Sequence, residues 1–252
     1  MNAALMGIYT LWLRDITRFV RDKPRIISSS VQPLLWLFVL GMGLSTAFAR
    51  GGGDNDYMRF IYPGIISMSV LFTSIFSAVS IIWDREFGFL KEVLVAPIPR
   101  WSVVIGRALG GSTVAVLQGT IILLVAPLVG VSFTLIQLAL SFLIMFMIAF
   151  AMTSFGILIA ARIHTHEGFQ VVVNFILLPM FFLSGAMFPV NEGLPAWMRA
   201  LVCVNPLSYG VDALRQTLVG IKINSIWLDL SVVAAFGILA LTSAVWYFEK
   251  HE

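Results

Sequence analysis

Over residues 108–161 the chain reads ALGGSTVAVLQGTIILLVAPLVGVSFTLIQLALSFLIMFMIAFAMTSFGILIAA, and these 54 residues include no Asp, Glu, Lys or Arg. A bilayer core about 30 Å thick is crossed by a helix of about 20 apolar residues, so this stretch is too long for one span. Pro127, Gly130 and Ser132 interrupt it, and Pro and Gly end helices and form turns. We therefore expect two membrane-spanning helices joined by a tight turn.

Four more charge-free stretches lie outside this one, at 26–49, 60–83, 168–191 and 230–248. The chain has 252 residues, of which 59% are hydrophobic and 12% charged, whereas a soluble domain has roughly a quarter charged residues. This composition excludes a soluble enzyme and a DNA-binding domain. The predicted fold is an all-α polytopic membrane protein, with one transmembrane domain over residues 1–252. Its six predicted spans lie near 30–49, 61–82, 103–128, 134–160, 169–187 and 227–248.

The Lys and Arg residues are divided unequally between the two sides of this arrangement. With an even number of spans both termini share one side, and that side receives 11 of the 16 Lys and Arg residues. Basic flanks are retained in the cytoplasm. We therefore expect a multi-pass protein of the bacterial cytoplasmic (inner) membrane with both termini in the cytoplasm.

The segment before the first span has the pattern of an amphipathic helix that ends near Pro24. Its apolar residues at helical spacing are Leu5, Ile8, Trp12, Ile16 and Phe19. Arg14, Arg18 and Arg21 share another face. Trp and Phe opposite basic residues favour a helix that lies in the membrane surface over an ordinary solvated helix.

A second amphipathic segment runs from Asp84 to Trp101 on the predicted cytoplasmic side. Its Phe87, Leu90 and Leu94 share one helical face, and Pro97 and Pro99 end the helix. Such a helix either lies on the lipid headgroups or docks on a partner protein, and the pattern alone leaves both interpretations open.

A long external stretch between residues 184 and 225 is too apolar for a free loop. It is predicted to form two short helices separated by Asn205 and Pro206. Apolar helices that do not span indicate a hairpin that dips into the outer leaflet, with its turns satisfied inside the protein. A cap on the membrane surface is the alternative.

These two segments together resemble the permease subunits of ABC-2 type ATP-binding cassette exporters, especially the daunorubicin and nodulation lipo-oligosaccharide types. The motifs that carry the resemblance are DREFG at 84–88, VAPIPR at 95–100, LSGAMFP at 183–189 and NPLSYG at 205–210. The resemblance covers essentially the whole chain, including the six spans and the long loop after the fifth.

The resemblance implies that residues 84–96 form a coupling helix seated in a cleft of a separate ATPase subunit. The residues expected to make this contact are Glu86, Phe87, Gly88, Leu90, Lys91 and Leu94. The resemblance also implies a re-entrant hairpin between spans five and six, and a transport path at the interface of two permease copies. The residues expected at the hairpin and exit are Pro189, Asn205, Pro206 and Tyr209.

The chain carries no phosphate-binding G-x-x-x-x-G-K-[ST] loop, because none of its four lysines follows a glycine. We therefore expect no enzymatic activity, no catalytic residues, no bound metal and no directly bound cofactor. ATP and Mg²⁺ are expected to be used by the partner ATPase subunit. The other expected partners are a second permease copy and membrane lipid, without nucleic acid.

An ion-coupled secondary transporter is the alternative function. Such proteins usually need carboxylates or His within the bilayer, and we expect none in the spans. Backbone ligands in broken helices can still bind sodium, so this alternative stays open.

An intramembrane protease is disfavoured, because the serines of the second predicted span have no base in that span. These serines are Ser67, Ser69, Ser74, Ser77 and Ser80. His164, His166 and Glu167 share one short loop without a further ligand nearby, which disfavours a metal site.

Small residues recur at Gly106 and Gly110 and again at Ala115 and Gly119, which allows another helix to approach closely, within one chain or between two.

A path without charges favours a hydrophobic, amphipathic or lipid-linked cargo. Drug, lipo-oligosaccharide and polysaccharide-lipid cargo are left open by the sequence, as is pairing with an identical or a different permease.

Overall fold

The computed structural model describes residues 3–49, 57–88, 98–163, 165–190 and 194–251, and all regular elements within these ranges are helices. The helices are α1 (Ala3–Arg21), α2 (Lys23–Ala49), α3 (Tyr57–Ser77), α4 (Val79–Glu86), α6 (Arg100–Leu123), the short 3₁₀ helix η1 (Ala126–Val129), α7 (Leu135–Arg162), α8 (His166–Phe182), α9 (Ala196–Val204), α10 (Pro206–Val219) and α11 (Ile226–His251).

Four stretches of helix are long and apolar enough to cross a bilayer. They are Lys23–Gly43, Tyr57–Glu86, Leu135–Arg162 and Ile226–Lys250. These stretches make the chain a polytopic membrane protein. The helix α6 has 24 residues but is more polar, and α8 has 17 residues, so neither is among the four. The prediction of six spans therefore stays a prediction.

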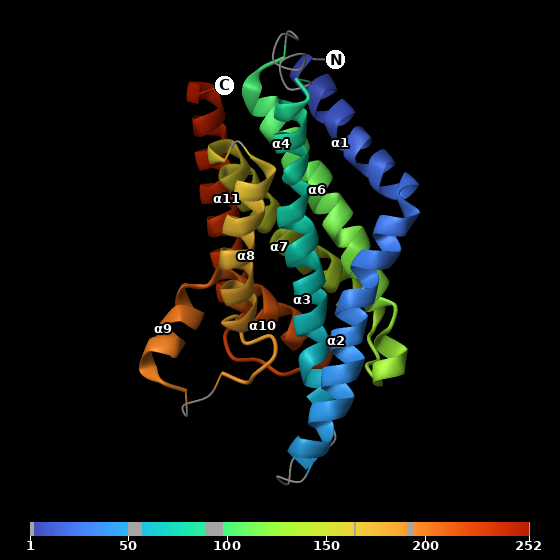
Figure 1. Ribbon diagram of the computed structural model, residues 1–252. Coiled ribbons are helices and arrows are strands. Elements are labelled where there is room, and N and C mark those ends of the chain that lie inside the picture. Colours follow the sequence, from blue (N-terminus) through green and yellow to red (C-terminus); the bar gives the residue numbers. More distant parts are fainter. Residues whose placement is uncertain (1–2, 50–56, 89–97, 164, 191–193, 252) are drawn as a thin grey trace.

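The helices form an elongated bundle in which α3 and α7 are central and mostly buried (Figure 1). Helix α7 packs against α11, α3 and α6, whereas α2 exposes many apolar side chains at the edge of the bundle. Both chain ends lie at one end of the bundle, which we call the termini end, and α9 and α10 lie toward the other, which we call the hairpin end (Figure 1).

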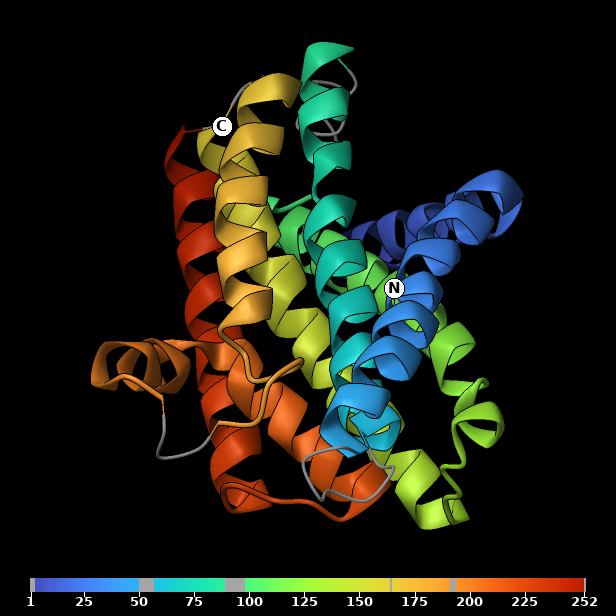
Figure 2. The ribbon, with the colours of Figure 1, turned by 60° about the horizontal axis from the view of Figure 1, so that its bottom comes forward.

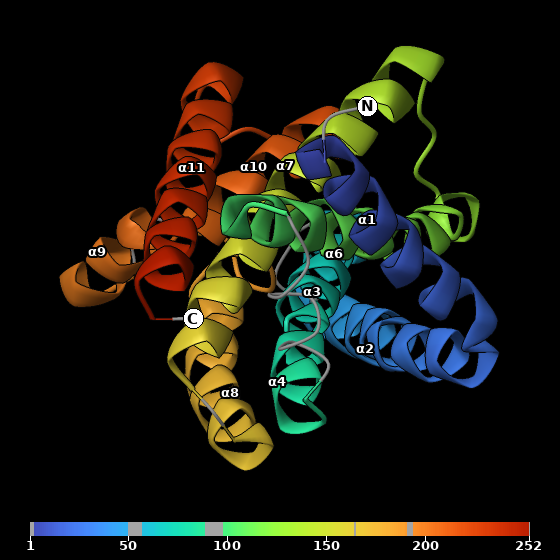
Figure 3. The same cartoon turned by 90° about the horizontal axis from the view of Figure 1, so that it is seen from above.

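Helix α1 lies across α6 and not apart from the bundle (Figure 3). The contact is possible because Gly106 and Gly110 leave room for it. A Cβ atom at Gly106 would lie 3.1 Å from the Cα atom of Ile8, and one at Gly110 would lie 2.7 Å from Oδ2 of Asp15. In this part of α6 the small residues therefore serve packing within one chain.

The break expected within residues 108–161 separates α6 from α7. Helix α6 ends at Leu123, η1 contains Pro127, and α7 begins after Thr134. The Thr134 side chain accepts from the Gln137 N–H, and Gln137 Oε1 accepts from the Thr134 N–H. This capping box satisfies backbone donors that the first turn of α7 would leave unpaired.

The hairpin end combines a buried helix with a peripheral one (Figure 2). Helix α10 packs against α11, α3 and α7 and has ten buried residues, whereas α9 has none. Helix α10 is therefore inserted in the bundle, where its Asp212, Arg215 and Thr217 side chains form hydrogen bonds with the backbone.

Candidate functional site

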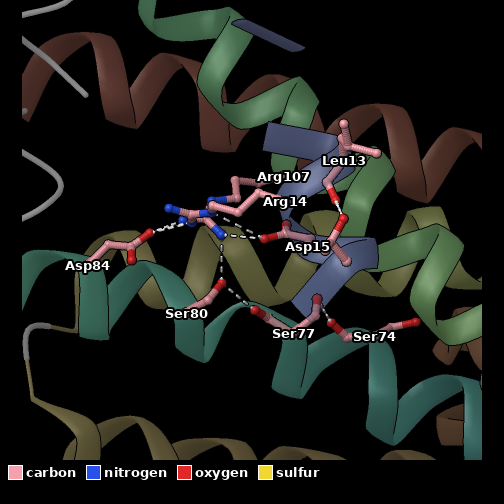
Figure 4. A network of polar contacts seen from close by, with 9 residues as sticks. Leu13, Arg14, Asp15, Ser74, Ser77, Ser80, Asp84 and Arg107 are labelled. Carbon is pink, nitrogen blue, oxygen red and sulfur yellow. Dashed lines mark hydrogen bonds and ion pairs between the residues drawn. The ribbon is translucent and has the colours of Figure 1, made fainter. Parts of the chain in front are cut away.

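Four charged side chains from three helices meet at the termini end (Figure 4). Arg107 of α6 donates from Nη1 to Oδ1 of Asp15 on α1 at 2.8 Å, and from Nη2 to Oδ2 of Asp84 on α4. Arg14 of α1 donates from Nη2 to the same Asp84 oxygen at 2.8 Å. This four-charge cluster (Arg14, Asp15, Asp84 and Arg107) joins α1, α4 and α6, and its formal charges cancel.

The four-charge cluster is largely shielded from water. The Arg107 side chain is 5% exposed, and those of Asp15 and Asp84 are 15% and 13% exposed. Burial raises the pKa of Asp15 above its ordinary value, although Arg107, Arg14 and Arg18 act to lower it. Burial also lowers the pKa of Arg14. The attraction between the opposite charges therefore offsets only part of the free-energy cost of removing them from water.

A row of serines extends the cluster along α3 and α4 (Figure 4). Arg107 Nη1 also donates to Ser80 Oγ at 3.1 Å. Ser80 Oγ in turn donates to the carbonyl of Ser77 at 2.8 Å, and Ser77 Oγ donates to the carbonyl of Ser74 at 2.6 Å. Such bonds from serine to its own helix backbone bend helices, which agrees with the interruption between α3 and α4 at Ala78.

The last turn of α4 is also bound to α7 and α8. Arg85 Nη1 donates to the carbonyl oxygens of Ala160 and Ile163, both at 3.2 Å, at the end of α7. Glu86 Oε1 accepts from the backbone N–H of His166 at 3.3 Å, at the start of α8. Four helices (α1, α6, α7 and α8) therefore hold the last turns of α4.

The expected coupling residues follow directly from this point. Glu86 is the last residue of α4, and Phe87 after it is 83% exposed. The helix predicted over 84–96 is interrupted in its described part, because α4 ends at Glu86 and Gly88 has φ of +78°, and residues 89–96 lie outside the described residues. Phe87 is therefore the C-cap of α4 and not a residue inside a longer helix. The remaining expected residues, Leu90, Lys91 and Leu94, lie outside the described residues.

The expected membrane-surface residues of α1 face the protein instead. Trp12 Nε1 donates to Thr113 Oγ1 of α6 at 3.1 Å, and Phe19 is only 7% exposed. The guanidinium of Arg18 lies 5.2 Å from the centre of the Trp83 ring. Trp12 and Phe19 therefore pack on the bundle, because the glycines of α6 let α1 approach it, and the placement of α1 in the membrane surface stays a prediction. The apolar side chains of α1 that are exposed are Leu5, Met6, Tyr9, Leu13 and Val20.

A second buried arginine lies at the hairpin end. Arg215 of α10 is 1% exposed and donates from Nη2 to the carbonyl of Gly185 at 2.8 Å and from Nε to that of Phe60 at 3.4 Å. Its guanidinium lies 4.0 Å from the centre of the Phe60 ring. Burial lowers the pKa of Arg215 to about 10, although Asp212 acts to raise it. Within the described ranges no carboxylate forms a salt bridge with Arg215.

The turn after α8, residues 183–187, is fixed by the same region. Tyr57 Oη donates to the carbonyl of Met187 at 3.0 Å, and Ser208 Oγ donates to that of Leu183 at 3.3 Å. Together with Arg215, these bonds tie the turn to α3 and α10.

Asn205 connects this turn region to the start of α10. Its Oδ1 accepts from the N–H of Leu207 at 3.1 Å, which caps α10. Its Nδ2 donates to the carbonyl of Met180 in α8 at 2.7 Å. One side chain therefore caps a helix and fixes its distance from α8.

The other expected hairpin residues have separate places. Pro206 is buried as the first residue of α10, where its missing N–H costs nothing. Tyr209 Oη donates to the carbonyl of Cys203 at 2.8 Å and thereby joins α10 to the end of α9. Pro189 is exposed and is not part of this contact network.

Comparison with known proteins gives the family. The model of the ABC-2 type transporter family matches residues 6–219, which is most of the chain. The chain belongs to the ABC-2 type transporter family. The family resemblance inferred from the motifs is thereby confirmed.

Three relatives show how similar this ABC-2 protein is in sequence to curated proteins of the family. The ycf38 protein of Cyanophora paradoxa is 33% identical over 84% of the chain and 73% of its own length. Nodulation protein J of Rhizobium leguminosarum bv. viciae is 29% identical over 84% of the chain and 81% of its own length. The protein named "Probable multidrug ABC transporter permease YbhR" of Escherichia coli K12 is 30% identical over 72% of the chain and 51% of its own length. The chain is therefore a transport permease of the ABC-2 type.

The sequence analysis of this permease did not single out Asp15, Arg107 and Arg215, which form buried polar networks in the structure. Arg107 lies inside the predicted span 103–128, and an arginine at that depth needs a partner. This signal could have led to Asp84, which lies within the DREFG motif. It could not have led to Asp15, because that pairing depends on how α1 crosses α6.

Asp229 corrects the expectation that the spans of the permease contain no carboxylate. It lies in the first turn of α11, inside the predicted range 227–248, and is fully buried. Its carboxylate interacts with Asn224 and with the carboxylate of Asp212. Asp212 of α10, which accepts from the N–H groups of Ile223 and Asn224, is buried as well.

Proposed function

We propose that this protein is the permease half of an ATP-driven exporter that moves a hydrophobic, amphipathic or lipid-linked substrate outward across the inner membrane. Two permease copies would work with a separate ABC ATPase subunit, which would use ATP and Mg²⁺, while this chain binds neither. The observation that carries the proposal is the four-charge cluster at the base of the segment expected to contact the ATPase.

The cluster suits mechanical coupling because it joins both ends of that segment. Asp84 lies in the last turn of α4, just before the connection to α6. Arg107 lies about two turns into α6, just after that connection. Their ion pair, together with Arg14, ties the connection to α1 as well. A displacement imposed by a partner on this connection would move α1, α4 and α6 as one unit, since breaking a buried pair costs several kcal/mol.

The six spans that we propose are the four apolar helices together with α6 and α8. Helix α6 is polar by composition, but its polar side chains turn inward. Gln118, for example, is fully buried and donates from Nε2 to Ser30 Oγ at 2.8 Å. Such inward polar contacts are typical of membrane helices.

Exposed Phe87 provides the test of ATPase coupling. The permease would be coexpressed with its ATPase subunit and copurified through a tag on the permease. Phe87→Ala should lower the recovered ATPase severalfold, because truncation of an apolar anchor typically costs about 2 kcal/mol. Trp227→Ala is the matched control, since Trp227 is another strongly exposed aromatic residue, 78% exposed on α11 near the hairpin end. Full recovery of the ATPase with folded Phe87→Ala would refute the coupling role.

The single cysteine provides a test of orientation. Cys203 is exposed in α9 at the hairpin end. If both termini are cytoplasmic, a membrane-impermeant maleimide added to intact cells whose outer membrane has been permeabilised should label Cys203, and Cys203→Ser should abolish the label. Labelling only after disruption of the inner membrane would reverse the proposed topology.

Ion-coupled transport is the second candidate, and the buried Asp229 is the observation that favours it, because carboxylates at such positions exchange protons. Liposomes containing this chain alone, with a pH gradient imposed and an internal pH dye, test it. We expect no protein-dependent proton flux. Flux that Asp229→Asn abolishes would favour the ion-coupled alternative.

A further inference from the structure

A cavity of about 310 Å³ lies beside the four-charge cluster, where α1, the start of α2, α3, α4, α6 and α8 come together. A second cavity of about 180 Å³ lies between α2 and α3. Phe19, Arg25 and Phe76 line both, so the two cavities adjoin at these side chains, and together we call them the adjoining space. A space of this size falls in the range of small-molecule sites, about 300–1,000 Å³.

The part of this space at the termini end is cationic. Arg18 and Arg25 line it, and within the described ranges neither forms a salt bridge with a carboxylate. Asp15 also lines the cavity, but its carboxylate already accepts from Arg107. His166 adds a buried Nδ1 atom that has no hydrogen-bond partner among the described residues.

The deeper part of the space is mostly apolar. Met68, Phe72 and Phe76 of α3 line it opposite Pro33 of α2, and the rings of Phe72 and Phe76 are stacked with centres 6.3 Å apart. Helices α2 and α3 both belong to the apolar stretches that can cross a bilayer. The space therefore has two guanidinium groups at one end, neither in a salt bridge among the described residues, and aromatic rings at membrane depth at the other.

We propose that this space binds an anionic amphiphile, with a phosphate or carboxylate headgroup at Arg18, Arg25 and His166 and an acyl chain along Phe76 and Phe72. The proposal rests on the proposed export function and narrows its substrate class. A neutral drug would leave the guanidinium groups unused, and a cationic one would be repelled by them. A free anion would leave the aromatic part of the space empty.

Native mass spectrometry of the full-length permease in detergent, titrated with dioctanoyl phosphatidic acid, tests the proposal. Arg18→Gln combined with Arg25→Gln should weaken binding about tenfold or more, since the double variant removes both charged hydrogen-bond donors to the headgroup. Arg21→Gln is the matched control, because Arg21 lies on α1 as Arg18 does but does not line the cavity. It should bind as the wild type does.

Two further probes separate the headgroup from the chain. Dioctanoylglycerol, which has the same chains without the phosphate, should bind at least about tenfold more weakly than the phosphatidic acid. Millimolar inorganic phosphate should not displace the phosphatidic acid, and Phe76→Ala should weaken its binding. Equal binding of dioctanoylglycerol, displacement by inorganic phosphate, or unchanged binding to the double variant would each overturn the proposal.

Copurification of the ATPase with the double variant shows whether a loss of lipid binding is separate from a loss of ATPase assembly, which the proposed function requires. Retained ATPase with lost phosphatidic acid binding supports the site. Retained phosphatidic acid binding by a double variant that has lost its ATPase would overturn it, because the arginines would then serve assembly.

Discussion

The two ends of the bundle bury an arginine in different ways. Arg107, at the termini end, is paired with carboxylates from two other helices, whereas Arg215, at the hairpin end, is bound by backbone carbonyls and an aromatic ring. The first arrangement depends on which side chains surround the arginine. The second depends on the path of the backbone and on the shape of the guanidinium group. The termini end should therefore respond to charge balance, and the hairpin end to geometry.

The largest expected effect is that of Arg107→Met. The substitution leaves the buried carboxylates of Asp15 and Asp84 with Arg14 alone, and breaking such a buried pair costs about 3–5 kcal/mol. Thermal unfolding in detergent should show a large drop in Tm. Arg100→Met, at the exposed start of α6, is the control and should change Tm little.

A second substitution sharpens the same test. Asp84→Asn added to Arg107→Met removes one of the unpaired charges and should recover part of the lost stability. If the double variant is less stable than Arg107→Met alone, charge balance does not govern the termini end.

Arg215→Lys should have the next largest effect. Lysine keeps the charge but cannot reach the carbonyls of Gly185 and Phe60 together while lying flat on the Phe60 ring, so we expect a loss of about 2 kcal/mol. Arg199→Lys, at an exposed position of α9, is the matched control. A variant with wild-type Tm would show that charge alone suffices at the hairpin end.

Asn205→Ala should cost about 1–2 kcal/mol, because it removes a helix cap and a side-chain bond to α8. Asn205→Ser separates the two contributions, since serine can cap α10 but is too short to reach Met180. The serine variant should fall between the wild type and the alanine variant in Tm. Equal loss in both variants would assign the whole effect to the bond with Met180.

The smallest expected effect is a pH dependence from Asp15. Because burial raises its pKa above 3.8, the folded protein keeps this proton at a pH where the unfolded chain has released it. The contribution of Asp15 to the free energy of unfolding therefore falls as pH rises through this window. Asp15→Asn should flatten the dependence of Tm on pH above about 4. Parallel curves for the two proteins would contradict this assignment.

Features set by neighbouring residues were predictable from the sequence. The break around Pro127 and the separation of two short helices at Asn205 follow from local backbone chemistry. The side that Phe19 faces was not predictable, because lipid and protein interior attract an apolar ring alike. The choice depends on the space above Gly106 and Gly110, which only the packing of α1 reveals.

The candidate sites also contain features that local sequence predicts and features that only the fold reveals. The motifs located the exposed Phe87 and the capping Asn205, which act close to their own positions in the chain. The pairing of Arg107 with Asp15 spans 92 residues and requires the fold. The end of α4 at Glu86 was missed because the apolar spacing of Phe87, Leu90 and Leu94 outweighed Gly88 in the prediction.

The cancelled charge of the four-charge cluster has a consequence for kinetics. Opposite charges a few ångströms apart produce a field that fades quickly with distance, so the cluster hardly attracts an approaching ion. The long-range field at the mouth of the neighbouring cavity then comes from Arg18 and Arg25. With a Debye length of about 8 Å at 0.15 M ionic strength, added salt should slow the arrival of an anion there, while the buried pairs of the cluster are screened much less.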